Sequence, residues 1–119
     1  MNYNTLDYKL AVDGNLYPVI KIDLTSKDIK ITVDDDQFTE YLLDNSVTLL
    51  QNTGVKDKNG KFIYDGDIIS YYKYELEIHY HIGMWCLKDN DGLKGALGMV
   101  HPLDIEVIGN KYVYTGGSL

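Results

Sequence analysis

The segment from Tyr74 to Ile82 has the most regular pattern in the sequence, an alternation of apolar or aromatic residues with two glutamates and two histidines. A period of two is typical of a β-strand with one buried side. The residues expected on the buried side are Tyr74, Leu76, Ile78, Tyr80 and Ile82. Gly83 interrupts the pattern, and the apolar segment 84–87 predicts a partner strand. The fold must therefore bury one face of a sheet.

The first half of the chain predicts a hairpin followed by a short helix. Residues 17–24 and 29–33 both alternate, which places Ile20, Ile22 and Leu24 on the core-facing side of the first strand. Three aspartates then precede Phe38, Tyr41 and Leu42, whose spacing is helical. Acids before such a spacing favour a helix N-terminus, so we expect a helix from Gln37 to Leu43.

Residues 53–69 contain the strongest turn signals. Asn59-Gly60 stands between two short strand-like segments and predicts a two-residue type I′ hairpin, which needs two positive φ angles. Gly66, flanked by Asp65 and Asp67, predicts a bend into the next strand. With the alternating segments, these turns predict a mainly β fold of the α+β kind.

Charge and composition exclude several function classes. The chain has 119 residues and a net charge of −7, and residues 1–50 hold nine acids and four lysines, a net −5. All eleven basic residues are lysines, so bidentate guanidinium contacts to phosphate or guanine are absent, and we expect no direct nucleic-acid binding. Cys86 is the single cysteine, which fits a reducing cytoplasm, and no apolar run is long enough for a membrane span.

The histidine strand is a weak candidate for a metal site. His79 and His81 share one strand face with Glu77, and a metal would also need His101 or Cys86. An exposed polar strand face explains the same residues more simply, so we expect neither a metal nor another cofactor. Paired carboxylates such as Asp65 with Asp67 are explained by turns, and we expect no enzymatic activity.

The acidic segment after residue 33 is the candidate for function without catalysis. Helix capping and a solvated face are one interpretation of these acids. The other is a negative surface that docks into the basic groove of a protein that handles nucleic acid. The residues predicted to bind this partner are Asp34, Asp35, Asp36, Glu40, Tyr41 and Asp44.

The sequence from Thr53 to Ile68, T-G-V-K-D-K-N-G-K-F-I-Y-D-G-D-I, together with E-V-I-G-N at 106–110, resembles the YopX family of phage and prophage proteins. The opening segment 8–14 departs from the family, because it lacks the usual tryptophan and arginine. The resemblance implies a phage origin and a C-terminal SH3-like small β-barrel at 53–119, fused to the hairpin-and-helix lobe at 1–52. The matched residues are turn and strand residues, so no catalytic or binding residue is carried over.

Three functions remain open from the sequence. The leading hypothesis is a phage-encoded, non-enzymatic inhibitor of a bacterial defence effector, such as a CRISPR nuclease, acting in the host cytoplasm by protein–protein docking. The first alternative is a protein that sequesters nucleotide immune signals by aromatic stacking. The second alternative is a phage assembly or regulatory module. The sequence leaves the partner and the formation of a homo-oligomer open.

Overall fold

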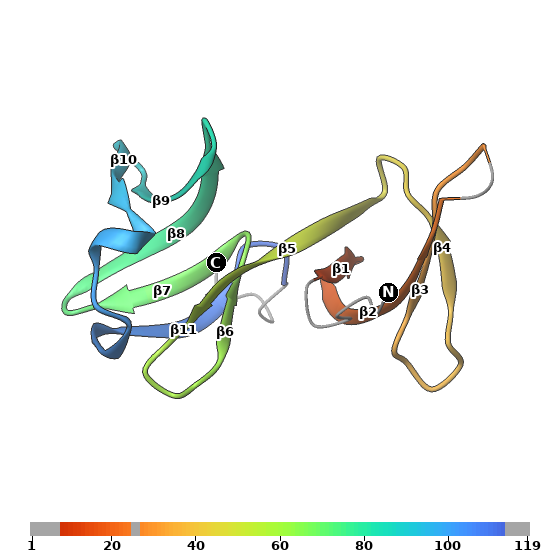
Figure 1. The fold of residues 1–119 in the computed structure, drawn as a ribbon, viewed down its shortest axis with the longest axis horizontal. Coiled ribbons are helices and arrows are strands. Elements are labelled where there is room, and N and C mark those ends of the chain that lie inside the picture. The colour runs from red at the N-terminus through yellow and green to blue at the C-terminus, as the bar shows by residue number, and fades with distance from the viewer. Residues whose placement is uncertain (1–7, 25–26, 114–119) are drawn as a thin grey trace. The chain divides into compact units, whose positions relative to one another are not determined.

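Two antiparallel β-sheets account for most of the computed structural model, which describes residues 8–24 and 27–113 (Figure 1). The strands are β1 (Tyr8–Val12), β2 (Asn15–Asp23), β3 (Lys30–Val33), β4 (Glu40–Leu42), β5 (Val47–Lys56), β6 (Phe62–Tyr64), β7 (Asp67–Tyr71), β8 (Tyr74–His81), β9 (Met84–Asp89), β10 (Gly92–Ala96) and β11 (Ile105–Asn110). The helices in this part of the chain are two 3₁₀ turns, η2 (Leu97–Met99) and η3 (Pro102–Asp104). The mainly β class is confirmed.

The chain divides into two compact units. The N-terminal unit extends to Gln51 and includes Tyr112 and Val113, and the C-terminal unit is Asn52–Lys111. Strand β5 crosses this boundary: its residues 47–51 pair with β1, whereas its later residues pair with β6. The six-stranded sheet has the order β4-β3-β2-β1-β5-β6.

The N-terminal unit is built on two hairpins, β1–β2 and β2–β3. The β2–β3 pairing confirms the hairpin predicted from the alternation, although its turn residues Thr25 and Ser26 lie outside the described residues. A bulge between Val19 and Lys21 shifts the strand's face. Val19 is therefore buried, and Ile20 is exposed, so the prediction that Ile20 faces the core was wrong.

The core of the N-terminal unit lies on one face of its strands. It comprises Leu10, Val19, Ile31, Val33 and Val47. Leu24, which was also predicted to face inward, is exposed. These buried residues are all aliphatic and come from four strands, so burial of apolar surface holds the unit together.

The predicted helix from Gln37 to Leu43 is wrong. The segment forms a tight loop, with Phe38 at a φ of +51°, and then strand β4, which pairs with β3. The Asp35 carboxylate accepts a hydrogen bond from the backbone N–H of Thr39 at 2.9 Å and so closes the loop before a helical turn can form. A side chain that binds the backbone locally competes with helix in this way.

The C-terminal unit contains a five-stranded sheet of order β10-β9-β8-β7-β11, together with β6 and the end of β5. The long strand predicted from the alternation is present as β8, but it ends at His81. Its middle residues, Leu76 and Ile78, are buried as predicted. Tyr74, Tyr80 and Ile82 are exposed, at 53%, 52% and 85%, so their predicted burial was wrong. Tyr74 and Tyr80 lie near the two ends of β8, and Ile82 lies in the turn after it. The core comprises Ile63, Ile69, Leu76, Ile78, Leu87, Leu97 and Ile105.

The described strands of this unit do not close into a barrel. Strands β10 and β11 are the two edges of the sheet, and they do not pair with each other. The sheet is strongly curved (Figure 1). The SH3-like arrangement implied by the resemblance therefore stays a prediction.

The loop between β5 and β6 differs from the predicted type I′ turn. Only Gly60 has a positive φ, +78°, and Asn59 does not. The N–H of Gly60 donates to the carbonyl of Asp57, and the N–H of Asp57 donates to the carbonyl of Lys61. The result is a longer turn with glycine at its left-handed position, a common hairpin alternative.

Candidate functional site

The residues predicted to bind a partner lie along the β3–β4 hairpin of the N-terminal unit. Asp34, Asp35 and Asp36 follow β3, and Glu40 begins β4, so these four acids gather at one end of the hairpin. Asp44 follows β4 and lies at the other end, where the N–H of Leu43 donates to the carbonyl of Ile29. The structure therefore does not bring Asp44 into the acidic group.

Two of the predicted residues use their carboxylates within their own turns. Asp35 accepts hydrogen bonds from the hydroxyl and N–H of Thr39, at 2.6 and 2.9 Å, and from the N–H of Gln37 at 3.1 Å. These bonds, led by the Thr39 hydroxyl, hold the pKa of Asp35 below its usual range. Asp44 accepts from the hydroxyl and N–H of Ser46, which lowers its pKa in the same way.

Tyr41 belongs to the interior face of the hairpin. It pairs with the buried Ile31 and packs against the N-terminal core. Desolvation raises the pKa of its hydroxyl, and Tyr17, Asp35 and Asp13 add to this shift. Tyr41 thus supports the sheet more than it offers a surface.

The acids left on the surface flank an exposed aromatic residue in the sequence. Asp34, Asp36 and Glu40 are exposed, and Glu40 lies 4.0 Å from Lys30. Phe38, between them in the chain, is 61% exposed. Sequence analysis placed Phe38 on the apolar face of a helix, and no local signal indicates its left-handed backbone. We call residues 34–40 the acidic loop.

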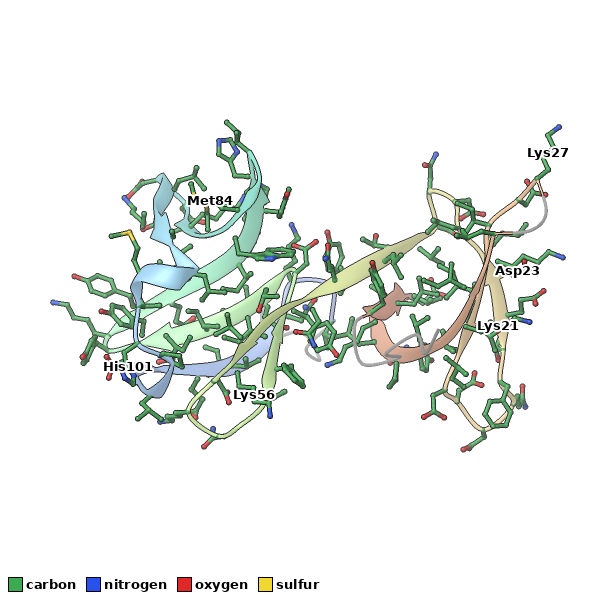
Figure 2. All side chains as sticks on the ribbon, viewed as in Figure 1. Lys21, Asp23, Lys27, Lys56, Met84 and His101 are labelled. Atoms are coloured by element: carbon green, nitrogen blue, oxygen red, sulfur yellow. The ribbon has the colours of Figure 1, made fainter. Side chains whose placement is uncertain are left out.

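Two lysines lie before or at the start of β3, and one of them, Lys30, reaches Glu40 of the acidic loop at 4.0 Å. Lys27, labelled in Figure 2, precedes β3, whereas the acidic loop follows β3. Between positions 34 and 40 the sequence contains four acids and no lysine. The loop is therefore a locally negative surface with an apolar centre.

The described residues around the histidine strand are not grouped as a three-ligand metal site. The rings of His79 and His81 stack with centroids 6.3 Å apart. His101, which a metal would have needed, accepts a hydrogen bond at Nδ1 from the N–H of Leu103 and caps η3 (labelled in Figure 2). Cys86 is buried. Within the described ranges, no three His, Cys, Asp or Glu side chains are grouped to hold a metal.

One carboxyl near this strand has a raised pKa. Burial raises the pKa of Asp65, and its electrostatic interactions with Lys111 and His79 only partly offset this shift. Glu77, which forms ion pairs with Lys88 at 3.7 Å and Lys111 at 3.3 Å, raises it slightly further. The shift follows from the partial burial of a turn residue, and Asp65 does not line the cleft described next.

A cleft of about 550 Å³ opens in the C-terminal unit. Its apolar and aromatic walls include Tyr71, Tyr74, Leu76, Leu87, Met99 and Val100, from β7, β8, β9 and η2 with the residue after it. Asp89 and Lys94, 3.7 Å apart, form an ion pair in its lining. Sequence analysis missed this site.

Two aspartates tie the C-terminal strand to the chain about 45 residues before it. The buried carboxylate of Asp57 accepts from the N–H groups of Asn59, Lys61 and Val107, each at 2.9 Å. Asp67 accepts from the N–H of Tyr64 at 2.7 Å and from the side-chain amide of Asn110 at 2.9 Å. The segments 53–69 and 106–110 are thus parts of one hydrogen-bond network.

The model of the YopX family, described as YopX protein, matches residues 7–114. The chain belongs to the YopX family. No curated protein matches it.

In this YopX chain, the segments 53–69 and 106–110 that resemble the family have structural roles. Asp57, Asp67 and Asn110 join strands, and Gly60 and Gly66 take positive φ angles of 78° and 80° in turns. The acidic loop and the cleft both lie outside segments 53–69 and 106–110. No helix in the described part of the chain is long and apolar enough to cross a bilayer.

Proposed function

We propose that this YopX protein acts without catalysis, by docking its acidic loop onto a protein of the bacterial host. In its specific form, the protein is a phage-encoded inhibitor that works in the host cytoplasm on a defence effector that handles nucleic acid, such as a CRISPR nuclease. Its C-terminal unit, in this proposal, is a variant of the SH3-like barrel that carries the loop-bearing N-terminal unit.

The exposure of Phe38 between acids carries the proposal. A buried aromatic anchor with a polar rim is the usual anatomy of a protein–protein hot spot. Here Phe38 offers the anchor, and Asp34, Asp36 and Glu40 offer a negative rim. A groove that binds nucleic acid presents the complementary positive charge, which would speed association and make it sensitive to salt.

The bonds of Asp35 support the same reading. They fix the loop's backbone in the free protein, so less conformational entropy is lost when a partner binds. These hydrogen bonds also distinguish loop shaping from partner contact, two roles that the sequence alone could not assign to different acids. Asp35 shapes the loop, and its neighbours are free to contact a partner through exposed side chains.

Sequestration of a nucleotide has weaker support. The cleft offers Tyr71 and Tyr74 for stacking, but its lining lysine, Lys94, is already paired with Asp89. Phosphate recognition normally needs unpaired cations or a cradle of N–H groups. We therefore keep docking as the proposed function.

The test is capture of the partner from a host lysate, identification of the captured protein, and measurement of its affinity for variants. We expect Asp34→Lys, Asp36→Lys and Glu40→Lys together, or Phe38→Ser alone, to weaken binding at least tenfold. Asp35 is left intact so that the loop keeps its shape. The control is His79→Ala with His81→Ala, which we expect to bind normally. Loss of binding in the histidine variant but not in the loop variants, with both folded, would reject the proposal.

A further inference from the structure

We propose that the cleft of the C-terminal unit is a binding site for a small, flat, mostly apolar molecule without net charge. This site is separate from the acidic loop, which belongs to the other unit. The inference rests on the size of the cleft, on its walls, on its one ion pair and on the exposure of its rim.

The size of the cleft suits a small molecule. Ligand pockets typically have volumes of roughly 300–1,000 Å³, and this cleft has about 550 Å³. Leu76 and Leu87 belong at once to the hydrophobic core and to the lining. The cleft is therefore an open continuation of the core.

The walls favour a flat ring over a branched chain. Tyr71 and Tyr74 bring two aromatic side chains to the lining, and Met99 brings a thioether. Aromatic rings prefer stacked or edge-to-face contacts with other rings, and methionine sulfur also contacts rings favourably. These three side chains would enclose a planar ligand and adapt to its shape.

The ion pair argues against a charged ligand. The Asp89 carboxylate lies 3.7 Å from the Lys94 ammonium and also accepts a hydrogen bond from the N–H of Asp91 at 2.8 Å. An anionic ligand would have to compete with Asp89 for Lys94, and a cationic ligand would have to compete with Lys94 for Asp89. Both side chains are partly exposed, so this competition is modest, and a neutral molecule avoids it.

The rim of the cleft is open to solvent. Met99 is 85% exposed, and Tyr74 is also exposed. Large apolar side chains in such positions leave apolar surface in water that a bound molecule would cover. A ligand can therefore enter without a movement of the sheet.

The test uses indole as the neutral probe, with tryptamine, indole-3-propionate and adenosine monophosphate as charged comparisons. Binding is followed through the methyl resonances of Leu76, Leu87 and Met99 in the whole protein. For so small a probe we expect a dissociation constant on the order of 1 mM for indole. The three charged compounds should bind at least several-fold more weakly.

Two matched pairs of variants locate the site. Tyr74→Ala and Met99→Ala remove side chains from the cleft and should weaken indole binding about fivefold or more. Tyr80→Ala and Leu103→Ala remove residues that are also exposed and lie on the same kinds of element outside the cleft, β8 and a 3₁₀ turn. They should leave binding unchanged. No indole-dependent shift at 10 times the expected constant, about 10 mM, would overturn the proposal. The proposal would also be overturned if cleft and control variants lost indole affinity equally, or if adenosine monophosphate bound more tightly than indole.

Discussion

The buried carboxylate of Asp57 accepts three hydrogen bonds from backbone N–H groups. Burial by itself raises the pKa of this group. The N–H groups of Val107, Lys61 and Asn59 outweigh that cost and hold the pKa of Asp57 below its usual value. The ionised form is therefore the one that the folded protein prefers.

Asp57→Asn should destabilise the protein at pH 7 by about 2–3 kcal/mol in urea unfolding, because the amide keeps one acceptor oxygen and places a donor beside N–H groups. A carboxyl with a lowered folded pKa stabilises above its unfolded pKa, about 3.9 for Asp, and loses this contribution as pH falls through the folded value. The difference between Asp57→Asn and the parent should therefore shrink below about pH 4.

Asp65→Asn is the comparison for this prediction, because the pKa of Asp65 is shifted in the opposite direction from that of Asp57. Burial raises the pKa of Asp65, so ionisation at neutral pH costs stability in the folded state. Removal of the charge should stabilise the protein at pH 7, and the gain should fade as pH falls through the raised folded pKa towards the unfolded value. Equal destabilisation by both asparagine substitutions would contradict the two assignments.

At the scale of elements, the β8–β9 turn is notable for its first residue. Ile82 and Gly83 form a two-residue turn with φ angles of 46° and 81°, the type I′ geometry. A β-branched residue is a rare outlier in the left-handed region. Asp13-Gly14, in the β1–β2 turn, shows the same geometry with a residue that tolerates it, at φ angles of 49° and 80°.

Ile82→Asn should raise the free energy of unfolding by about 1 kcal/mol, because Asn-Gly is a favoured type I′ pair and the exposed isoleucine contributes little burial. Thermal or urea unfolding measures the change. Ile82→Ala is the control, since it also removes the apolar side chain but is less suited than asparagine to a positive φ. If Ile82→Ala is more stable than Ile82→Asn, the backbone is not strained at this position.

Sequence patterns identified the strands better than the turns. The alternation predicted β8 and the β2–β3 hairpin, because apolar periodicity reflects which face is buried. The helix at 37–43 and the type I′ turn at Asn59-Gly60 failed for one shared reason. In each segment an aspartate side chain, Asp35 or Asp57, captures backbone N–H groups and imposes a different loop. Whether a carboxylate binds its own backbone depends on spatial contacts that periodicity does not record.

At the scale of the whole molecule, excess negative charge opposes compaction. The net charge is −7, and self-repulsion of like charges destabilises a compact state. Sodium chloride should therefore raise stability, by on the order of 1 kcal/mol between 10 and 500 mM, as measured by urea unfolding. The proposed docking should respond in the opposite direction and weaken with salt.

Asp34→Asn with Asp36→Asn provides the matched control, because both side chains are exposed and the change takes the net charge from −7 to −5. The salt dependence of stability should become shallower in this variant. If salt lowers the stability of the parent, its surface ion pairs outweigh its self-repulsion, and the prediction is wrong.

The candidate sites differ in how far sequence could predict them. The acidic loop is continuous in the chain, so its negative charge could be predicted from the sequence. The sequence did not show that Asp35 bonds to its own loop while its acidic neighbours remain exposed. The cleft draws its walls from residues between Tyr71 and Val100 on separate strands and a 3₁₀ turn. The order and register of the paired strands and the contact of η2 with β9 bring them together, and apolar alternation alone predicts none of these.

The bond from Val107 to Asp57 spans 50 positions of the chain, and β7 takes β11 as a sheet neighbour across an intervening meander. During synthesis, Asp57 leaves the ribosome long before Val107 does. At translation rates of about 5–20 residues per second, the C-terminal unit waits a few seconds for its edge strand. A chain stalled in this interval exposes the unpaired edge of β7, which makes it a substrate for chaperones before its C-terminal unit is complete.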